Sequence, residues 1–155
     1  MRENVEVVFG DITNSEARYI AHQCNCVTEY SLGLAKSIFE KFPYSDCYQG
    51  RKEKDVPGTI KIFGNGVDQR YVINMFGQYY PGKPRHSENQ NDRISYFRKC
   101  LEEITKITDL ESIAFPKNIG CGLAGGNWSE YFNEISIFAS KTNAKVFIYD
   151  FKGEN

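Results

Sequence analysis

The stretch Ser112 to Trp128, SIAFPKNIGCGLAGGNW, is the part of the sequence that most clearly indicates the fold. Ser112 to Phe115 is a β-branched and aromatic run, which is typical of a buried strand. Four glycines follow within seven residues, and Asn127 and Glu130 then open a helical pattern with the spacing of an N-cap and capping box. An ordinary strand-to-helix turn needs fewer glycines. The stretch therefore predicts a backbone cradle for an anion, most simply phosphate, at a helix N-terminus.

The same loop also carries a G-x-G-x-x-G pattern at Gly120, Gly122 and Gly125, and the next strand ends in Asp150. This is the pattern of dinucleotide-binding folds. Two features argue against that interpretation. Residues 116–118 separate the strand from the first glycine, and no second half follows that could hold a nicotinamide. A nicotinamide-dependent oxidoreductase is therefore kept only as a distant alternative.

The composition is that of a globular protein. The chain has 155 residues, of which 41% are hydrophobic and 14% aromatic, so we expect a single domain over residues 1–155 with a substantial core. No apolar run approaches the ~20 residues that span a bilayer, so no membrane partner is expected. The formal net charge is −1 and there is no basic block, which argues against a broad nucleic-acid surface.

The compartment is predicted from the cysteines and the N-terminus. The chain has five cysteines, an odd number, and MRENVEVVFGD leads straight into a strand pattern without the features of a signal peptide. These observations predict reduced thiols and a cytoplasmic, reducing location.

Strand and helix patterns alternate along the chain. Strands are expected at residues 5–9, 19–24, 59–63, 71–76, 112–115 and 145–149. Helical spacing of apolar residues predicts helices around residues 34–42, 94–104 and 128–138. Residues 64–66 suggest a hairpin turn, and residues 77–89 form a long polar loop of the kind that is often functional. This order predicts an α/β sandwich whose ligand lies at the carboxyl ends of the strands.

A few side chains outside the glycine loop could carry chemistry. His22, Cys24 and Cys26 alternate along a predicted strand, and a fourth candidate, Cys121, lies apart from them in the glycine loop itself. Strand residues two apart are about 6–7 Å from each other, too far to share one zinc ion easily at about 2.0–2.3 Å. We therefore expect no metal site. Nothing in the sequence marks a base for a nucleophilic cysteine beyond two histidines, and His86, in the polar loop, is most simply a surface residue.

His22 has two interpretations. It is either a core histidine with satisfied hydrogen bonds or a functional residue, because it lies just before Asn25 at a strand end where such sheets bind ligands.

Three motifs, in this order and spacing, resemble the macrodomain family. They are Gly10-Asp11-Ile12, then His22-Gln23-Cys24-Asn25-Cys26 leading to Gly33-Leu34-Ala35, then Ile119-Gly120-Cys121-Gly122-Leu123-Ala124-Gly125-Gly126. The likeness covers nearly the whole chain. It is strongest to the small stand-alone macrodomains of the ADP-ribose 1″-phosphate phosphatase type, which carry a similar H-x-C-N-C stretch.

The resemblance implies a three-layer α/β/α sandwich around a mixed, mostly parallel sheet, with ADP-ribose in a cleft above the strand ends. At the adenine end, Asp11 would accept a hydrogen bond from the amino group and the Ile12 amide would reach the ring. An aromatic residue near the end of the last strand, Tyr149 or Phe151, would flank the adenine.

The same resemblance assigns the rest of the site. The diphosphate would be held by the amides of the glycine loop, Gly120, Cys121, Gly122, Leu123 and Ala124, and Ile119 would be a further substrate-binding residue. The facing loop and helix N-terminus would be Gly33, Leu34 and Ala35. Asn25 would contact the distal ribose, and His22 is a candidate catalytic residue together with Asn25.

The sequence departs from the family at points that matter for mechanism. Macrodomain hydrolases that use a lysine–aspartate pair have an aspartate where this chain has Ala124, and a lysine where it has Phe76 and Gly77. The loop from Thr28 to Leu32 also has less glycine than in many relatives. The lysine–aspartate mechanism is therefore not supported.

Three functional hypotheses follow from the resemblance. The first is a phosphatase that removes the 1″-phosphate of ADP-ribose 1″-phosphate, with His22 as general acid/base and Asn25 orienting the terminal ribose. The second is a non-catalytic reader of ADP-ribose. The third is a de-ADP-ribosylating hydrolase that uses a positioned water. The expected partners are ADP-ribose or ADP-ribose 1″-phosphate, with an ADP-ribosylated protein as a further candidate, and no cofactor is expected.

Overall fold

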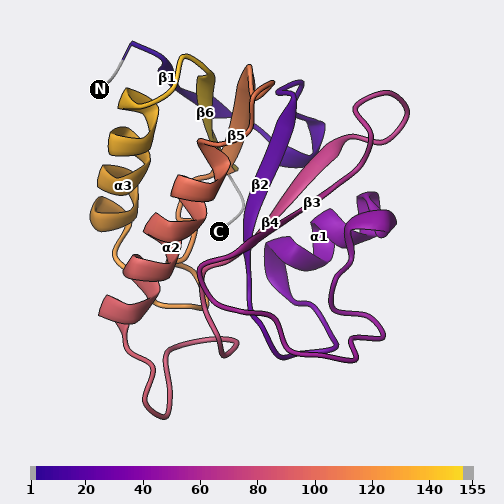
Figure 1. The fold of residues 1–155 in the computed structure, drawn as a ribbon, viewed down its shortest axis with the longest axis vertical. Coiled ribbons are helices and arrows are strands. Elements are labelled where there is room, and N and C mark those ends of the chain that lie inside the picture. Colours follow the sequence, from indigo (N-terminus) through magenta and orange to yellow (C-terminus); the bar gives the residue numbers. More distant parts are fainter. Residues whose placement is uncertain (1–2, 152–155) are drawn as a thin grey trace.

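The fold is a six-stranded sheet covered by helices on both faces, seen in a computed structural model that describes residues 3–151 (Figure 1). The strands are β1 (Val5–Phe9), β2 (Tyr19–Cys24), β3 (Ile60–Phe63), β4 (Tyr71–Phe76), β5 (Ser112–Pro116) and β6 (Lys145–Asp150). The helices are α1 (Gly33–Lys41), α2 (Gln90–Ile104) and α3 (Trp128–Ser140), with short 3-10 turns η1 (Ile12–Asn14) and η2 (Pro43–Ser45).

The sheet is mixed and mostly parallel. Its strand order is β1-β6-β5-β2-β4-β3, and only the β3–β4 pair is antiparallel. Helices α2 and α3 lie side by side on one face, and α1 covers the other (Figure 1). The predicted three-layer α/β/α sandwich is therefore confirmed.

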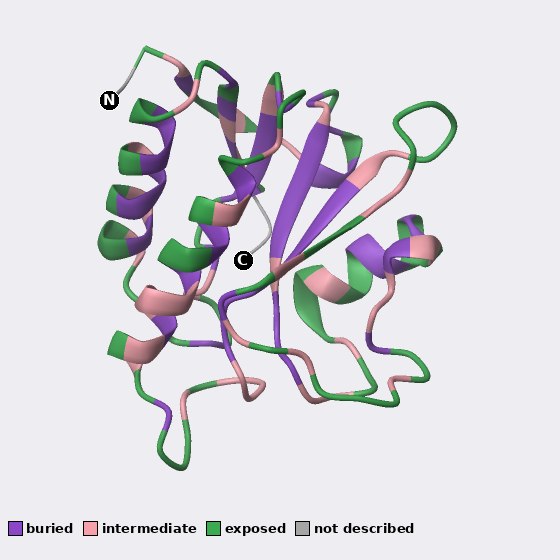
Figure 2. Ribbon diagram, viewed as in Figure 1, coloured by how far each residue is buried: buried purple, intermediate pink, exposed green. Residues whose placement is uncertain are grey.

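Two hydrophobic cores, one on each face, hold the layers together. Strand side chains alternate between them, so that β2 contributes Tyr19 and Ala21 to the α2–α3 core and Ile20 and Cys24 to the α1 core. Figure 2 shows the buried strands between helices whose outer sides are exposed. β2 and β4 are buried on both faces, and most of their residues are accordingly apolar without a regular alternation of polar ones.

The predicted elements agree with the structure to within one or two residues at most ends. The hairpin predicted at residues 64–66 joins β3 to β4. Asn127 caps α3 by accepting a hydrogen bond from the Ser129 amide, but the reciprocal capping box occurs at α2, between Asn89 and Asp92. In that box, the Asp92 carboxylate accepts a hydrogen bond from the Asn89 amide at 3.0 Å.

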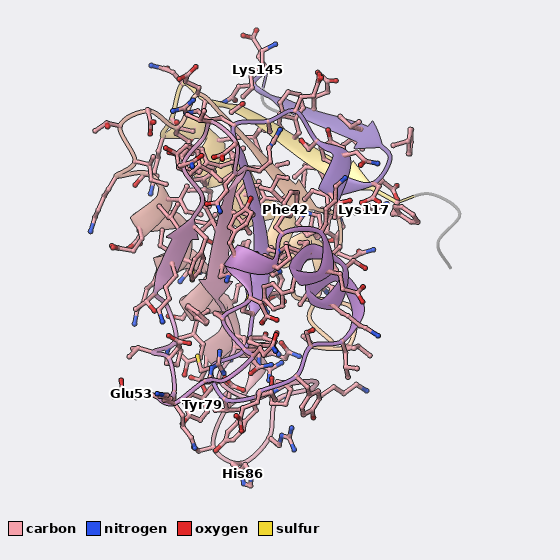
Figure 3. The ribbon with its side chains drawn as sticks, turned by 90° about the vertical axis from the view of Figure 1, so that its right-hand side faces the viewer. Phe42, Glu53, Tyr79, His86, Lys117 and Lys145 are labelled. Carbon is pink, nitrogen blue, oxygen red and sulfur yellow. The ribbon has the colours of Figure 1, made fainter. Side chains whose placement is uncertain are left out.

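The topology brings distant loops to one edge of the sheet. Because β1, β6, β5, β2 and β4 run parallel, the segments that follow them all emerge at their carboxyl ends. These segments include the glycine loop after β5 and the long loop after β4. In Figure 3, His86 marks the tip of that long loop, at the end of the molecule opposite Lys145 at the start of β6. Within residues 3–151, no helix is long and apolar enough to cross a membrane.

Candidate functional site

A cleft of about 400 Å³ opens at the carboxyl ends of β2 and β5. Three segments wall it: the glycine loop after β5, the segment from the end of β2 to the start of α1, and the loop after β4. Of the residues predicted for the site, the cleft brings together His22, Asn25, Gly33, Leu34, Ala35, Ile119, Gly120, Cys121, Gly122, Leu123 and Ala124. This volume lies within the range of small-molecule sites.

The glycine loop presents unpaired main-chain donors. Within residues 3–151, no hydrogen-bond partner is found for the amide N–H groups of Gly120, Gly122, Leu123 and Ala124. Cys121 differs from the expectation, because its amide donates to the Asn118 carbonyl at 2.8 Å and closes a turn inside the loop. Gly120 has a φ of +75°, and a Cβ there would lie 2.5 Å from the Tyr131 ring. The loop therefore requires glycine at this position for both its conformation and its packing.

The opposite wall is an uncapped helix N-terminus. Leu32 occupies the N-cap position of α1 and provides no side-chain hydrogen bond. The first amides of α1, from Gly33 to Ala35, have no partner in the described chain. Gly33 has a φ of +58°, which turns the chain into the helix. Leu123 reaches across the cleft, its Cδ1 atom lying 4.0 Å from where a Cβ of Gly33 would be.

The charge of the lining favours an anion. Among the residues that line the cleft, none is aspartate or glutamate, and the single cation is Lys117. The Lys117 Nζ lies 3.4 Å from Asp150 Oδ2 at the end of β6, and its side chain is 39% exposed. Two sets of unpaired amides thus belong to residues that line a cleft with no carboxylate of its own.

The long loop after β4 is held rigidly by a buried ion pair. Arg93 of α2 is fully buried and contacts Glu88 at 2.8 Å. Glu88 accepts hydrogen bonds from the Tyr79 and Tyr80 amides, and Arg93 donates to the Tyr80 and Gly82 carbonyls. The loop therefore has a defined position, although it is long and polar.

The same helix fixes the glycine loop. The Ala124 carbonyl accepts a hydrogen bond from Gln90 Nε2 at 3.0 Å and lies 3.4 Å from Arg93 Nη1. These donors hold the carbonyl toward α2. Two walls of the cleft are thus tied to one helix terminus.

His22 lies under the floor of the cleft, 1% exposed. Its Nε2 is 2.7 Å from Asn74 Oδ1, and Asn74 Nδ2 donates to the Ser45 carbonyl. Because the Asn74 oxygen faces the ring, Nε2 carries the proton and Nδ1 carries the lone pair. Burial lowers the pKa of His22 to about 4, so the ring is neutral at pH 7.

The side chain of Asn25 is engaged in the turn that follows it. Its Oδ1 accepts hydrogen bonds from the Val27 and Thr28 amides, both at 2.9 Å, and its Nδ2 donates to Thr28 Oγ1 at 3.0 Å. Asn25 therefore shapes the loop between β2 and α1. Its amide group still borders the cleft.

A model of the family described as "Macro domain" matches residues 21–133, which include the β2 end, the long loop and the glycine loop. The chain belongs to the macro domain family. An uncharacterised 17.5 kDa protein from the tk-vs intergenic region of enterobacteria phage T4 is 23% identical over 150 residues, covering 88% of this chain and 91% of that protein.

Solved structures share the fold of this macrodomain. A protein of unknown function from Bacteroides thetaiotaomicron is 26% identical, with a TM-score of 0.75 and coverage of 95% of this chain and 98% of that one. The structure of Thermosipho africanus DarTG in complex with ADP-ribose has a TM-score of 0.75 at 18% identity, covering 99% of this chain and 43% of that one. At 18% identity, the similarity to the DarTG structure shows a shared fold and no more.

Four residues predicted for the adenine end lie outside the lining of the macrodomain cleft: Asp11, Ile12, Tyr149 and Phe151. Asp11 caps η1 by accepting hydrogen bonds from the Thr13 amide and hydroxyl, and the Ile12 side chain is buried in the α1 core. Tyr149 lines a separate shallow hollow beside β1. All four still lie at the carboxyl ends of β1 and β6, the edge of the sheet that carries the cleft.

The macrodomain cleft also contains residues that the sequence analysis did not assign. They are Gln23, Thr28, Tyr30, Leu32, Tyr48, Gln78, Pro81, Gly82, Pro116, Lys117 and Asn118. The long polar loop was predicted as functional, which covers Gln78 to Gly82. No local pattern identifies Tyr48, because a tertiary contact places it in the cleft.

Three thiols of the macrodomain, those of Cys24, Cys26 and Cys121, are poor nucleophiles. Burial raises the pKa of Cys121 to about 11 and that of Cys26 to about 12, and it raises the pKa of Cys24 as well. These thiols are therefore protonated at pH 7. Among the described residues, no group of histidine, cysteine, aspartate and glutamate side chains is arranged to hold a metal ion.

Proposed function

We propose that the cleft binds ADP-ribose, with its diphosphate between the glycine loop and the N-terminus of α1. The observation that carries the proposal is that two sets of amides without a partner in the described chain belong to residues lining one cleft, and that this lining has no carboxylate. Amides at a helix N-terminus and in a glycine-rich loop are donors suited to phosphate oxygens. The ADP-ribose complex of a protein with the same fold supports this choice of ligand.

The proposed ligand extends along the edge of the sheet. Asn25 follows β2 and Asp11 follows β1, and the strand order β1-β6-β5-β2 places three strand spacings between them, about 14 Å. The glycine loop after β5 lies between these ends. The adenine would then lie beside Asp11, near Tyr149 and Phe151, and the terminal ribose beside Asn25.

The catalytic function that we propose is removal of the 1″-phosphate from ADP-ribose 1″-phosphate. Water would attack phosphorus, the bond from phosphorus to the 1″ oxygen would break, and that oxygen would take up a proton. His22 Nδ1 is the ring atom that carries the lone pair and would accept a proton from the water, in place of its contact with Cys24 Sγ at 3.9 Å. With a pKa of about 4, His22 is a weak base at pH 7, and only about one ring in 10³ would be protonated to act as an acid.

Binding without catalysis is the second candidate, and two observations favour it. His22 is buried with a low pKa, and both polar atoms of the Asn25 side chain already have partners in the protein. A reader of free or protein-linked ADP-ribose requires only the amide cradle. A hydrolase that relies on a lysine–aspartate pair is disfavoured, because Phe76 and Gly77 are buried and Ala124 carries no carboxylate.

We also infer that residues 1–155 form a single domain, since both cores share one sheet. Cytoplasmic location and the lack of a broad nucleic-acid surface stay predictions from the sequence.

The test is phosphate release from ADP-ribose 1″-phosphate, measured beside calorimetric binding of ADP-ribose and NAD on one preparation. We expect ADP-ribose to bind more tightly than NAD, because none of the residues assigned to the cleft is assigned to a nicotinamide ring. If His22 acts in the phosphatase, His22→Ala should lower turnover by roughly 10²-fold with little change in affinity. Binding without phosphate release would leave the reader function, and equal or tighter NAD binding would contradict the ADP-ribose proposal.

A further inference from the structure

Two buried side chains hold the main chain of Asn25. The Asn25 amide donates to the Tyr48 hydroxyl oxygen at 2.7 Å, and the Asn25 carbonyl accepts from Arg51 Nη2 at 3.2 Å. Both donor and acceptor of this residue are thus satisfied by side chains more than twenty positions away in the sequence. Such groups are more often paired within a sheet ladder.

The sheet cannot supply these partners at this point. The ladder between β2 and β4 ends at Cys24 and Phe76, and β5 pairs with β2 only at Tyr19 and Ile20. Asn25 is therefore the first residue beyond the sheet, and its orientation depends on Tyr48 and Arg51.

The two side chains are themselves firmly placed. Tyr48 is 4% exposed, with its ring edge-on to Phe39 at 5.2 Å, and the Arg51 guanidinium lies 4.9 Å from the Tyr48 ring centroid. Arg51 also pairs with Asp55 at 3.1 Å. Asp55 in turn contacts Lys61 at 2.8 Å. The Tyr48 hydroxyl is thus fixed at the floor of the cleft, which Tyr48 itself lines.

We infer that Tyr48, supported by Arg51, is a positioning residue for the terminal-ribose end of the cleft. The inference rests on the proposed function, which places that ribose beside Asn25. Without the hydroxyl, the Asn25 amide would be buried and unpaired, and the peptide would shift to find another partner. The turn from Asn25 to Thr28 would move with it, because Asn25 Oδ1 accepts the Thr28 amide. The adenine and diphosphate contacts would stay in place.

The test compares Tyr48→Phe with Tyr44→Phe. Tyr44 belongs to η2, and its hydroxyl donates to the Arg70 carbonyl at 2.6 Å, away from the cleft. Each variant loses one hydroxyl hydrogen bond to the main chain, so both should lower the thermal midpoint. We expect Tyr48→Phe to raise the Kd of ADP-ribose roughly five- to tenfold, a normal coupling for contacting residues. The Kd of ADP, which lacks the terminal ribose, should stay within about twofold, and Tyr44→Phe should change neither Kd.

A second variant covers the case in which Tyr48→Phe does not fold. Arg51→Lys keeps a cation beside Asp55 but loses the forked donor that reaches the Asn25 carbonyl, so it should show the same selective loss for ADP-ribose. Equal losses for ADP and ADP-ribose, or wild-type affinity for both in folded variants, would overturn the positioning role. Wild-type protein that binds neither ligand would overturn the proposed function and this inference with it.

Discussion

The substitution Gly122→Val separates ligand binding from folding. Gly122 is exposed at the cleft, its φ lies outside the left-handed region, and an added Cβ would meet no atom of the described protein within 4 Å. No packing or backbone strain therefore opposes the change. We expect the free energy of unfolding to change by less than about 0.5 kcal/mol, as for surface substitutions away from special features.

The expected effect on ADP-ribose binding follows from the open space beside Gly122. That space is where the diphosphate would meet the Gly122 amide, so a branched side chain would force the ligand away from the loop. A hydrogen bond to a charged group contributes about 1.5–3 kcal/mol. Losing one such bond should raise the Kd of ADP-ribose roughly 10- to 150-fold.

The assay is calorimetry with ADP-ribose, combined with thermal unfolding of the same samples. Gly120→Ala is the contrasting variant, because its Cβ would lie 2.5 Å from Tyr131 and its φ is +75°, so it should lose stability. Gly122→Val that is as stable as wild type and binds ADP-ribose with wild-type affinity would show that the cradle is misplaced.

Three further outcomes are expected. Burial holds the pKa of His22 at about 4, below its unfolded value of ~6.5. The free energy of unfolding should therefore be at its full value above about pH 6.5 and should decrease by about 3 kcal/mol as the pH falls to 4, because the unfolded state takes up the proton first. Chemical denaturation across this range should show the loss, and His22→Gln should remove it whereas His86→Gln should not. Asp11→Asn keeps the Oδ1 acceptor that caps η1 but loses its charge, so calorimetry should show weaker ADP-ribose binding, by about 10-fold or more, without a change for ribose 5-phosphate. Arg93→Met should lower the free energy of unfolding by about 3–5 kcal/mol, because the buried Glu88 carboxylate loses its counter-charge, and adding Glu88→Gln should recover part of this loss. A double variant no more stable than the single one would contradict the ion-pair explanation.

The buried strand β5 and the glycine loop could be predicted from the sequence, because their surroundings in the fold restrict which residues can stand there. The strand that begins at Ser112 was visible because both faces of the sheet are covered, so its residues are apolar without alternation. The glycine loop was visible because Gly120 leaves no space for a Cβ beside Tyr131. In both cases the tertiary environment restricts the residue types, so the sequence pattern indicates it.

Other parts of the site show no sequence pattern from which their contacts could be predicted. The state of His22 depends on Asn74 of the neighbouring strand and on burial under α1, and neither can be found from the H-x-C-N-C stretch. Arg93 follows the capping box of α2, and its position in the helical pattern does not show that it would hold the carbonyls of two loops. These contacts join segments that only the folded sheet brings together.

The use of main-chain donors explains why such contacts matter. An amide has no side chain whose rotamer can adjust to a ligand, so its direction is set by whatever holds its peptide. In this protein Arg93 and Gln90 hold the Ala124 carbonyl, and Tyr48 and Arg51 hold the peptide of Asn25. The glycines therefore allow an anion to approach the main chain. Buried side chains from distant segments fix the peptide groups that would bind it. Differences in ligand preference among macrodomains of this kind should then track residues at the positions of Tyr48 and Arg93 as well as those in the glycine loop.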